Sequence, residues 1–247
     1  PNVNGNVNQV TLDLADLSSV RAAAEETKSK VSKLDALINN AGIMQTPARK
    51  TADGFEMQIG TNHLGHFLLN GLLFDLVEKA SGRIVTVSSI AHKYGRMYLD
   101  DLMMTENYSP IYAYGQSKLA NMLYAVELDR KLKSSGSKVT SYACHPGYSA
   151  TSLQSTGPTG FWKGIYKITN ALIAQPAAKG AIPTVLCAAG IEAVPGAYYG
   201  PTGMGESRGP VSDALVSEKA LNEADAKNLW QQSETLVDFS WEHALPA

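Results

Sequence analysis

The fold is decided by the stretch Leu34-Asp35-Ala36-Leu37-Ile38-Asn39-Asn40-Ala41-Gly42. Four of its first six residues are apolar, and a run this short is typical of a strand rather than a helix. A nearly continuous apolar strand is the kind that lies in a parallel sheet with both faces buried. The small residues that follow allow the backbone to approach a ligand closely. We therefore predict a buried strand over 34–39 that ends at a ligand-binding edge.

The same alternation of short apolar runs and helical patterns continues on both sides of this stretch. Further strands are expected at 7–13, 83–88, 138–145 and 197–199. Helices are expected after Ser18 as N-cap and over 55–77, 113–132, 161–174, 177–189 and 223–237, the last with Leu229, Trp230 and Leu236 as its buried stripe. Strands that alternate with helices predict an α/β fold around a parallel sheet.

Length and composition favour one soluble domain over 1–247. The chain has 44% hydrophobic and 18% charged residues, and its net charge of −2 gives no electrostatic case for nucleic acid or an acidic membrane surface. The sequence contains no run of 18 apolar residues, so it predicts no membrane span. The two cysteines, Cys144 and Cys187, are too few for a disulfide framework, and we expect reduced thiols and a cytoplasmic location.

Tyr114 and Lys118 form the strongest chemical signal in the sequence. Four residues apart on a predicted helix, their side chains lie on one face. A phenol has an unperturbed pKa of about 10, and a nearby ammonium lowers it by favouring the phenolate. The pair is therefore a candidate general acid and base. Tyr112 is not an equal candidate, because Gln116 stands where its lysine would be.

Several polar or turn-forming residues follow directly after predicted strands. Asp13, Asn40, Ser89 and Pro146 each fall at the carboxyl end of one. Ligands of doubly wound sheets bind outside these ends, so the four positions should gather at one edge. The hydroxyl of Ser89 can donate a hydrogen bond to a substrate oxygen there.

The motifs in their order resemble the short-chain dehydrogenase/reductase family, and most closely its retinol-dehydrogenase-type branch with bacterial relatives. They are the blocks 34–42, 61–67, 82–89, 112–121 and 145–151, and the resemblance runs from about Val10 to Val237. It implies a Rossmann-like doubly wound parallel sheet with helices on both faces. It also implies an NAD(P)-dependent oxidoreductase that acts on a carbonyl/alcohol pair.

The resemblance carries residue roles as well. It implies the catalytic residues Ser89, Tyr114, Lys118 and Asn62, the last holding a water beside the lysine. It implies cofactor contacts from Asp13, Leu14, Asn40, Ala41, Gly42, Tyr114, Lys118, Pro146, Gly147 and Thr151. From the residues alone, Asp13 could equally cap a helix. NADP is favoured over NAD by the branch resemblance, although the end of the second family strand, which decides the choice, is not in this chain.

No metal site is expected. His63 and His66 are three residues apart, without a cysteine, carboxylate or third histidine at ligand distance. We expect ordinary packing or partial exposure for both. The stretch 200–205 looks superficially like a phosphate loop, but no lysine follows as such a loop requires, so we predict a loop near the substrate.

One departure from the family pattern is large. The family opens with a strand and a turn of the form Thr-Gly-x-x-x-Gly-x-Gly, whereas this chain opens at Pro1. We expect the first two βα units, roughly 60 residues, to be missing. In the strand order 3-2-1-4-5-6, the strand at 7–13 would then lie about 14 Å from that at 34–39, and such a sheet should not hold together.

The expected substrate is a hydrophobic aldehyde, ketone or secondary alcohol. Tyr114 follows Ser89 by 25 positions, and 98–104 in this insertion should form part of the substrate rim. Apolar residues that suggest a pocket roof, though equally compatible with core packing, are Met103, Met104, Phe161, Trp162, Ile165, Tyr166 and Ile168. A homodimer or homotetramer is expected.

Two alternatives stay open at this point. The first is a non-catalytic or truncated binding protein on the same scaffold, which the missing glycine-rich turn favours and the intact Ser89, Tyr114, Lys118 and Asn62 disfavour. The second is a nucleotide-sugar epimerase or dehydratase, which also uses Tyr-x-x-x-Lys. The block 39–42 and the short C-terminal region speak against it.

Overall fold

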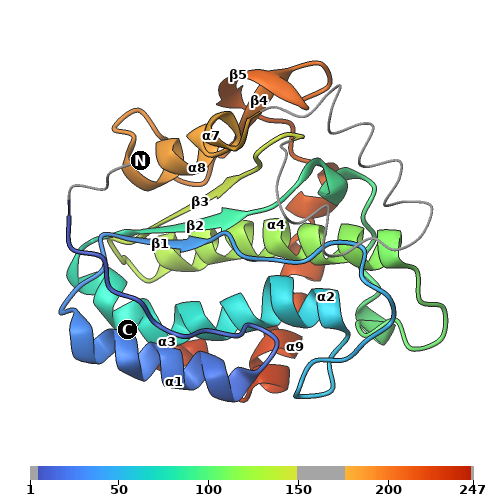
Figure 1. The fold of residues 1–247 in the computed structure, drawn as a ribbon, viewed down its shortest axis with the longest axis horizontal. Coiled ribbons are helices and arrows are strands. Elements are labelled where there is room, and N and C mark those ends of the chain that lie inside the picture. Colours follow the sequence, from blue (N-terminus) through green and yellow to red (C-terminus); the bar gives the residue numbers. More distant parts are fainter. Residues whose placement is uncertain (1–4, 149–175, 246–247) are drawn as a thin grey trace.

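Five strands form one sheet in the order β1-β2-β3-β4-β5 (Figure 1). The structure is a computed structural model that describes residues 5–148 and 176–245. The strands are β1 (Ala36–Asn39), β2 (Arg83–Val87), β3 (Thr140–Cys144), β4 (Tyr198–Gly203) and β5 (Arg208–Asp213). The first four run parallel, with Val85 opposite both Ile38 and Tyr142, and β5 runs antiparallel to β4. This confirms the predicted Rossmann-like α/β class.

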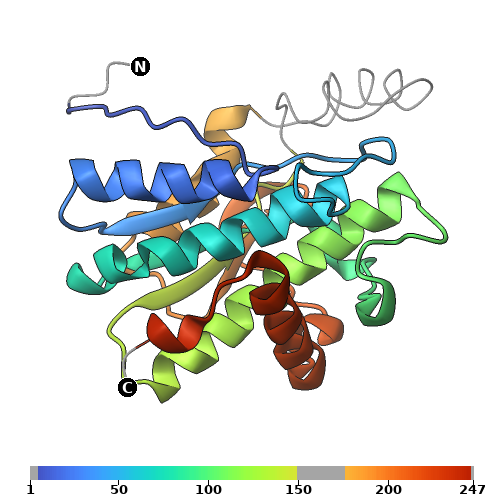
Figure 2. The same ribbon diagram turned by 90° about the horizontal axis from the view of Figure 1, so that it is seen from below.

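Helices cover both faces of the sheet (Figures 1 and 2). One face carries α1 (Leu17–Lys30), α3 (Gly65–Lys79), α4 (Pro110–Ser134) and α9 (Glu223–Val237), whereas α7 (Ala177–Gly180) and α8 (Ile182–Ala189) lie over the other. The shorter helical turns are α2 (Met57–Ile59), η1 (Gly60–Leu64), η2 (Ile90–Lys93), η3 (Leu99–Asp101), η4 (Glu218–Leu221) and η5 (Trp241–His243). Among the described residues, no helix is long and apolar enough to cross a membrane.

An aromatic cluster joins α9 to α3 and α4. Trp230 stacks on Tyr124 of α4, with planes 13° apart, and meets Phe67 of α3 edge-on at 5.1 Å between centroids. Trp241 of η5 contacts the same rings. Aromatic pairs contribute beyond the area they bury, so this cluster fixes how α9 lies on the two helices. Leu229 and Trp230 are buried as predicted, and Leu236 packs at the core margin.

The prediction of a strand at 7–13 is wrong. Residues 5–13 have no strand structure and are mostly exposed, and β1 to β5 form a continuous sheet without them. A strand needs a hydrogen-bonding neighbour, and this segment lies outside the five-stranded ladder. The expectation that a sheet including 7–13 would not hold together concerned the gap before the strand at 34–39 and stays a prediction. The cap of the next helix differs too, because Asp16, not Ser18, accepts the first amides of α1.

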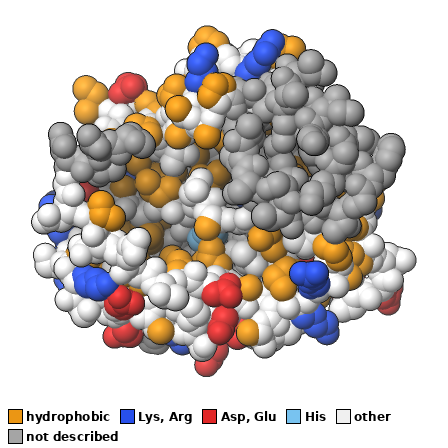
Figure 3. Space-filling view, in the orientation of Figure 1, with side chains coloured by type: hydrophobic (Ala, Val, Ile, Leu, Met, Phe, Trp, Pro, Cys, Tyr) orange, Lys and Arg blue, Asp and Glu red, His pale blue; other side chains and the backbone are white. Residues whose placement is uncertain are grey.

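β1 is less buried than its apolar sequence predicts. Ile38, at its centre, is 43% exposed, whereas Val85 and Tyr142 beside it in the sheet are buried. In Figure 3, hydrophobic side chains gather across the middle of the face over the sheet. β1 pairs with β2 alone among the described residues, so one of its edges is unpaired. The prediction that 34–39 is buried on both sides is wrong for Ile38.

The C-terminal strand is longer than predicted and belongs to a hairpin. Gly200 to Gly203, which the sequence suggested as a loop, continue β4, and β5 returns antiparallel with an irregularity at Pro201/Gly203. Glycine is required at 200, because a Cβ there would come within 1.9 Å of the His145 ring. Pattern reasoning missed the hairpin because glycine and proline usually mark the end of a strand.

Candidate active site

Tyr114 and Lys118 lie together on the N-terminal half of α4, next to the carboxyl end of β2. The Lys118 ammonium is 5.9 Å from the Tyr114 ring centroid, and both side chains are buried. Lys118 Nζ donates to the Val87 carbonyl at 3.1 Å, at the end of β2. Burial lowers the pKa of Lys118 to about 8, since the charged form is poorly solvated there, while Cys144 acts in the opposite sense.

Asn62 connects this pair to the loop that follows β1. It lies in η1, a π-helical turn between α2 and α3, and is fully buried. Its side chain accepts from the Ile43 amide at 2.8 Å and donates to the Ile43 carbonyl and to Ser117 Oγ, each at 2.9 Å. π-Helical turns often occur at functional sites. The predicted water beside Lys118 stays a prediction.

Gly42 packs directly against Asn62 and Lys118. A Cβ at this position would lie 2.8 Å from Asn62 Oδ1 and 3.8 Å from Lys118 Nζ. Only glycine therefore allows the backbone to approach both polar side chains this closely. Its neighbours Asn40 and Ala41 are exposed at the end of β1. The structure thus brings Gly42 of the predicted 40–42 block against the predicted catalytic residues Asn62 and Lys118.

Ser89 follows β2 and begins the 3₁₀ turn η2. Its Oγ accepts from the Ala91 amide at 3.2 Å, which leaves its own proton available for donation. Ala91 packs with Tyr114 and Met44 in a small buried cluster. The turn therefore holds Ser89 at the same edge as Tyr114.

Pro146 and Gly147 form the turn after β3. Gly147 has φ +66°, and a Cβ there would lie 2.4 Å from the Ser207 carbonyl oxygen. The neighbouring Tyr148 amide donates to the same carbonyl at 2.7 Å. The turn is therefore seated on the loop between β4 and β5. Thr151 lies outside the described residues, as do the predicted helix 161–174 and its pocket candidates Phe161, Trp162, Ile165, Tyr166 and Ile168.

Asp13 and Leu14 have different surroundings. The exposed Asp13 side chain accepts from the Ala15 amide at 2.9 Å, which makes a local turn before α1. Leu14 is buried in the core, and its carbonyl lies where a side chain on Gly65 would be. Of the two, Asp13 is at the surface, and the Leu14 side chain packs in the core. Their contact with a cofactor stays a prediction.

Three residues at this edge were not singled out from the sequence. Asn121 Nδ2 donates to the Val87 carbonyl at 3.2 Å, and Ser88 Oγ donates to the Lys118 carbonyl at 2.8 Å, so both join α4 to the end of β2. The buried Asn39 amide has no hydrogen-bond partner within the described residues. Asn121 lies three residues after Lys118, a helical spacing that could have identified it.

The predicted substrate rim packs more tightly than expected. Leu102 and Met104 are buried, and Met103 packs against both large hydrophobic clusters with its sulfur accepting from the Glu56 amide. Gln116 of α4 holds the segment through the Leu102 carbonyl and the Tyr98 amide. These methionines therefore pack in the core. Core packing was the alternative to a pocket roof that the sequence left open.

The two histidines of η1 and α3 are buried rather than partly exposed. His63 Nε2 lies 2.8 Å from Ser233 Oγ, and His66 Nδ1 donates to the Asn62 carbonyl at 3.1 Å. Burial lowers the pKa of His63 to about 3 and that of His66 to about 4. Within the described ranges, no three His, Cys, Asp or Glu side chains are placed to hold a metal ion.

The buried ammonium and the glycine beside it fit a ribose. Among the described residues Lys118 Nζ has one hydrogen-bond partner, the Val87 carbonyl, and an ammonium carries three donors. The remaining donors suit hydroxyl oxygens, and Gly42 leaves space next to them. The donor set is thus consistent with a nicotinamide dinucleotide.

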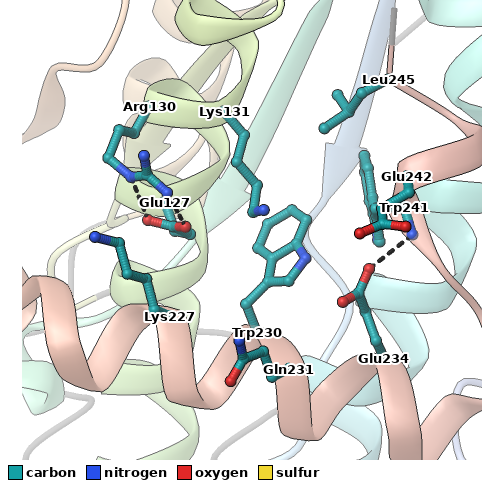
Figure 4. A pocket seen from close by; sticks show the side chains of 10 residues that line it. All are labelled: Glu127, Arg130, Lys131, Lys227, Trp230, Gln231, Glu234, Trp241, Glu242 and Leu245. Atoms are coloured by element: carbon teal, nitrogen blue, oxygen red, sulfur yellow. Dashed lines mark hydrogen bonds and ion pairs between the residues drawn. The ribbon is translucent and has the colours of Figure 1, made fainter. Parts of the chain in front are cut away.

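A separate cavity of about 300 Å³ lies between the C-terminal half of α4 and α9 (Figure 4). Its lining includes Trp230, Trp241 and the bidentate pair of Arg130 with Glu127. None of the predicted catalytic or cofactor residues lines it. It is therefore distinct from the edge that gathers Tyr114, Lys118 and Asn62.

The comparison with protein families identifies this arrangement. The family model described as short chain dehydrogenase matches residues 2–159. The chain belongs to the short-chain dehydrogenase/reductase family. Human retinol dehydrogenase 14 is 40% identical over 230 residues, covering 92% of this chain and 65% of that protein. Mouse retinol dehydrogenase 11 is 41% identical over 225 residues, covering 90% and 67%.

Solved structures of other proteins share this fold. An uncharacterized protein from Mycobacterium paratuberculosis is 42% identical, with a TM-score of 0.77 over 93% of this chain and 75% of that one. A short chain dehydrogenase from Burkholderia cenocepacia in complex with NADP is 20% identical, with a TM-score of 0.55 over 76% and 72%, and shows the shared fold. The chain spans about two thirds of the length of the retinol dehydrogenases cited above.

Proposed function

We propose that this protein transfers a hydride between NADP(H) or NAD(H) and a carbonyl/alcohol substrate. This proposal rests on one observation: the Tyr114 ring centroid lies 5.9 Å from the buried Lys118 ammonium. Gly42, Asn62 and Ser89 lie at the same edge of the sheet. The cofactor would supply the hydride chemistry, and the protein would orient the reactants and move the proton. The family resemblance favours NADP, and the Burkholderia structure with the same fold holds NADP.

Each residue has a chemical task in this proposal. Tyr114 gives its phenolic proton to the developing alkoxide during reduction and removes the alcohol proton during oxidation. Lys118 favours the phenolate and holds ribose hydroxyls, and Ser89 donates to the substrate oxygen. Asn62 fixes the loop carrying Ile43 and Gly42 and connects the lysine to water. The remaining proposed cofactor contacts come from Asp13, Asn40, Ala41, Pro146, Gly147 and Thr151.

The proposed substrate is a hydrophobic aldehyde, ketone or alcohol. The relatives at about 40% identity are named retinol dehydrogenases, and retinol is a long apolar alcohol. We extend this substrate class, rather than retinol itself, to the present chain. The cytoplasmic location, the single domain and a homodimer or homotetramer remain predictions from the sequence.

A panel of apolar and polar aldehydes and ketones, each assayed with NADPH and NADH, tests the proposal. We expect turnover that favours long apolar aldehydes and NADPH. Absence of turnover with every member, despite cofactor binding by the folded protein, would favour the non-catalytic alternative. Turnover of nucleotide sugars with the cofactor recycled within the reaction would favour an epimerase or dehydratase.

A further inference from the structure

His92 makes two hydrogen bonds that determine which ring nitrogen carries its proton. Nδ1 lies 2.7 Å from the Ser89 carbonyl oxygen, which can only accept, so Nδ1 must be the protonated nitrogen. The Ser217 amide donates to Nε2 at 3.2 Å, so Nε2 must be unprotonated. Both contacts require the same neutral tautomer. Burial lowers the pKa of His92, which favours this neutral form.

The ring is also held from the side. His92 is fully buried and meets the Tyr198 ring of β4 edge-on, with centroids 5.3 Å apart. The Tyr198 hydroxyl lies 3.5 Å from Nδ1. An imidazole that is packed on one side and bonded at both nitrogens has one orientation. It can therefore fix the position of the carbonyl that it contacts.

Further bonds fasten the same turn to the segment after β4. Lys93 Nζ pairs with Glu206 Oε2 at 2.7 Å, and Glu206 also accepts from the Leu215 amide. Lys219 Nζ donates to the Gly95 carbonyl at 2.9 Å. The turn that begins with Ser89 is thus joined to residues 206–219, which lie more than 100 positions later in the chain.

We propose that His92 is a positioning residue for Ser89: its Nδ1–H holds the Ser89 carbonyl, and the Ser217 amide keeps the ring in the tautomer and orientation that this contact needs. The proposal rests on the proposed function, in which Ser89 donates to the substrate oxygen. A shift of its carbonyl rotates the Ser89 backbone and moves the hydroxyl away from the reacting oxygen. Misplacement on the ångström scale is costly for catalysis. His92 itself touches no reacting atom in this scheme.

Two substitutions separate the two contacts. In His92→Asn, the side-chain amide nitrogen takes the position of Nδ1 and keeps the bond to the Ser89 carbonyl, while the contact with Ser217 is lost. In His92→Gln, the longer side chain reaches toward Ser217 and the side-chain donor to the Ser89 carbonyl is lost, which leaves only the bond from the backbone amide of residue 92 at 3.1 Å. Tyr124→Phe is the control, because it removes a buried hydrogen bond with Asn70 far along α4.

The first readout is steady-state kinetics. We expect His92→Gln to lower kcat at least tenfold with KM for the cofactor within twofold of wild type, and His92→Asn to recover at least half of that loss on a logarithmic scale. Tyr124→Phe should lower Tm with kcat unchanged. Equal kcat losses in both His92 variants would assign the residue a purely structural role and overturn the proposal.

The second readout needs no activity. The Ala91 amide donates to Ser89 Oγ, so its hydrogen exchange reports the position of the serine side chain. We expect exchange at Ala91 to accelerate at least tenfold in His92→Gln, and less than threefold in His92→Asn and Tyr124→Phe. Unchanged exchange in His92→Gln would overturn the positioning role. If the wild type lacks activity while this pattern holds, the proposed function fails and the positioning of Ser89 stands.

Discussion

At the residue scale, one turn of α4 brings together the two groups that the proposed chemistry needs. The i, i+4 spacing places Lys118 over the Tyr114 ring, and the Val87 carbonyl at the end of β2 orients the ammonium. The lysine is buried without a carboxylate hydrogen-bonded to it among the described residues. Its charge therefore acts mainly on the phenol and on whatever ligand lies at this edge.

Tyr114→Phe should lower kcat by about 10²- to 10⁴-fold, the usual contribution of a positioned acid or base. The ring and its packing remain, so Tm and cofactor binding should change little. Tyr112→Phe is the matched control, since Tyr112 is exposed and lies two residues earlier on the same helix. A Tyr114→Phe enzyme with more than a tenth of the wild-type rate would exclude Tyr114 as the proton donor.

Lys118→Met should move the pH profile of alcohol oxidation to higher pH. With its pKa at about 8, Lys118 is largely protonated at neutral pH and loses its charge as the pH rises through this value. Below it the ammonium favours the phenolate, and the methionine does not. Rates measured from pH 6 to 10 test this. Lys133→Met, an exposed position on the same helix, should leave the profile in place; a coincident profile for Lys118→Met would contradict the pairing.

At the element scale, close backbone contacts hold the turns of the site on α4. A Cβ on Gly95 would lie 2.3 Å from the Gly115 carbonyl oxygen, so the chain after η2 runs directly over the helix beside Tyr114. Gly42, in the loop after β1, instead lies against the side chains of Asn62 and Lys118. The π-helical turn η1 places Asn62 between these elements, with bonds to Ile43 and Ser117.

Gly95→Ala should therefore weaken both the fold and the activity. The methyl group has to push backbone away rather than a flexible side chain, which costs about 1–3 kcal/mol in a packed core. Because the Ser89 turn moves with it, kcat should fall as well. Thermal unfolding and kinetics of Gly95→Ala measure both effects. Gly5→Ala, where nothing lies within 4 Å, is the control, and equal behaviour of the two variants would refute the close contact.

At the scale of the whole molecule, α9 and η5 join parts of the chain that are distant in sequence. Trp230 and Trp241 enter the aromatic cluster of α3 and α4, and Arg21 of α1 donates to the Val237 and Asp238 carbonyls. His63 bonds Ser233 of α9 in the same region. These contacts join α1, α3, α4 and α9 on one side of the sheet.

Stability should fall as the pH drops below about 6.5. The folded-state pKa values of His63 and His66, about 3 and about 4, lie below the unfolded value, so the unfolded chain takes up protons first. Each histidine then costs about 1.4 kcal/mol per pH unit until its folded-state pKa is reached. Urea unfolding at pH 7.5 and 5.5 measures this. His63→Gln should show a smaller difference between the two conditions, and an equal difference would argue against a neutral buried His63.

The sequence predicted the regular elements because their patterns are local. The helix 223–237 was placed at its observed ends, and β2, β3 and α4 lie within a few residues of expectation. Asn62 and Gly42 were found only through the ordered motifs of the family. The tightness of the 98–104 segment was not predicted, because its partners Gln116 and Glu56 lie far from it in sequence.

What the sequence determined by itself was the α/β class, the family and the pair of Tyr114 with Lys118, because each depends on spacing within a short stretch or on the order of stretches. Only the tertiary structure decided that residues 5–13 lie outside the sheet, that Gly200 continues a strand, and that His92 joins Ser89 to Ser217. These outcomes depend on which backbone and side-chain groups meet across long separations in the chain. No local pattern encodes that, since a strand or a buried histidine is defined by its neighbours in space.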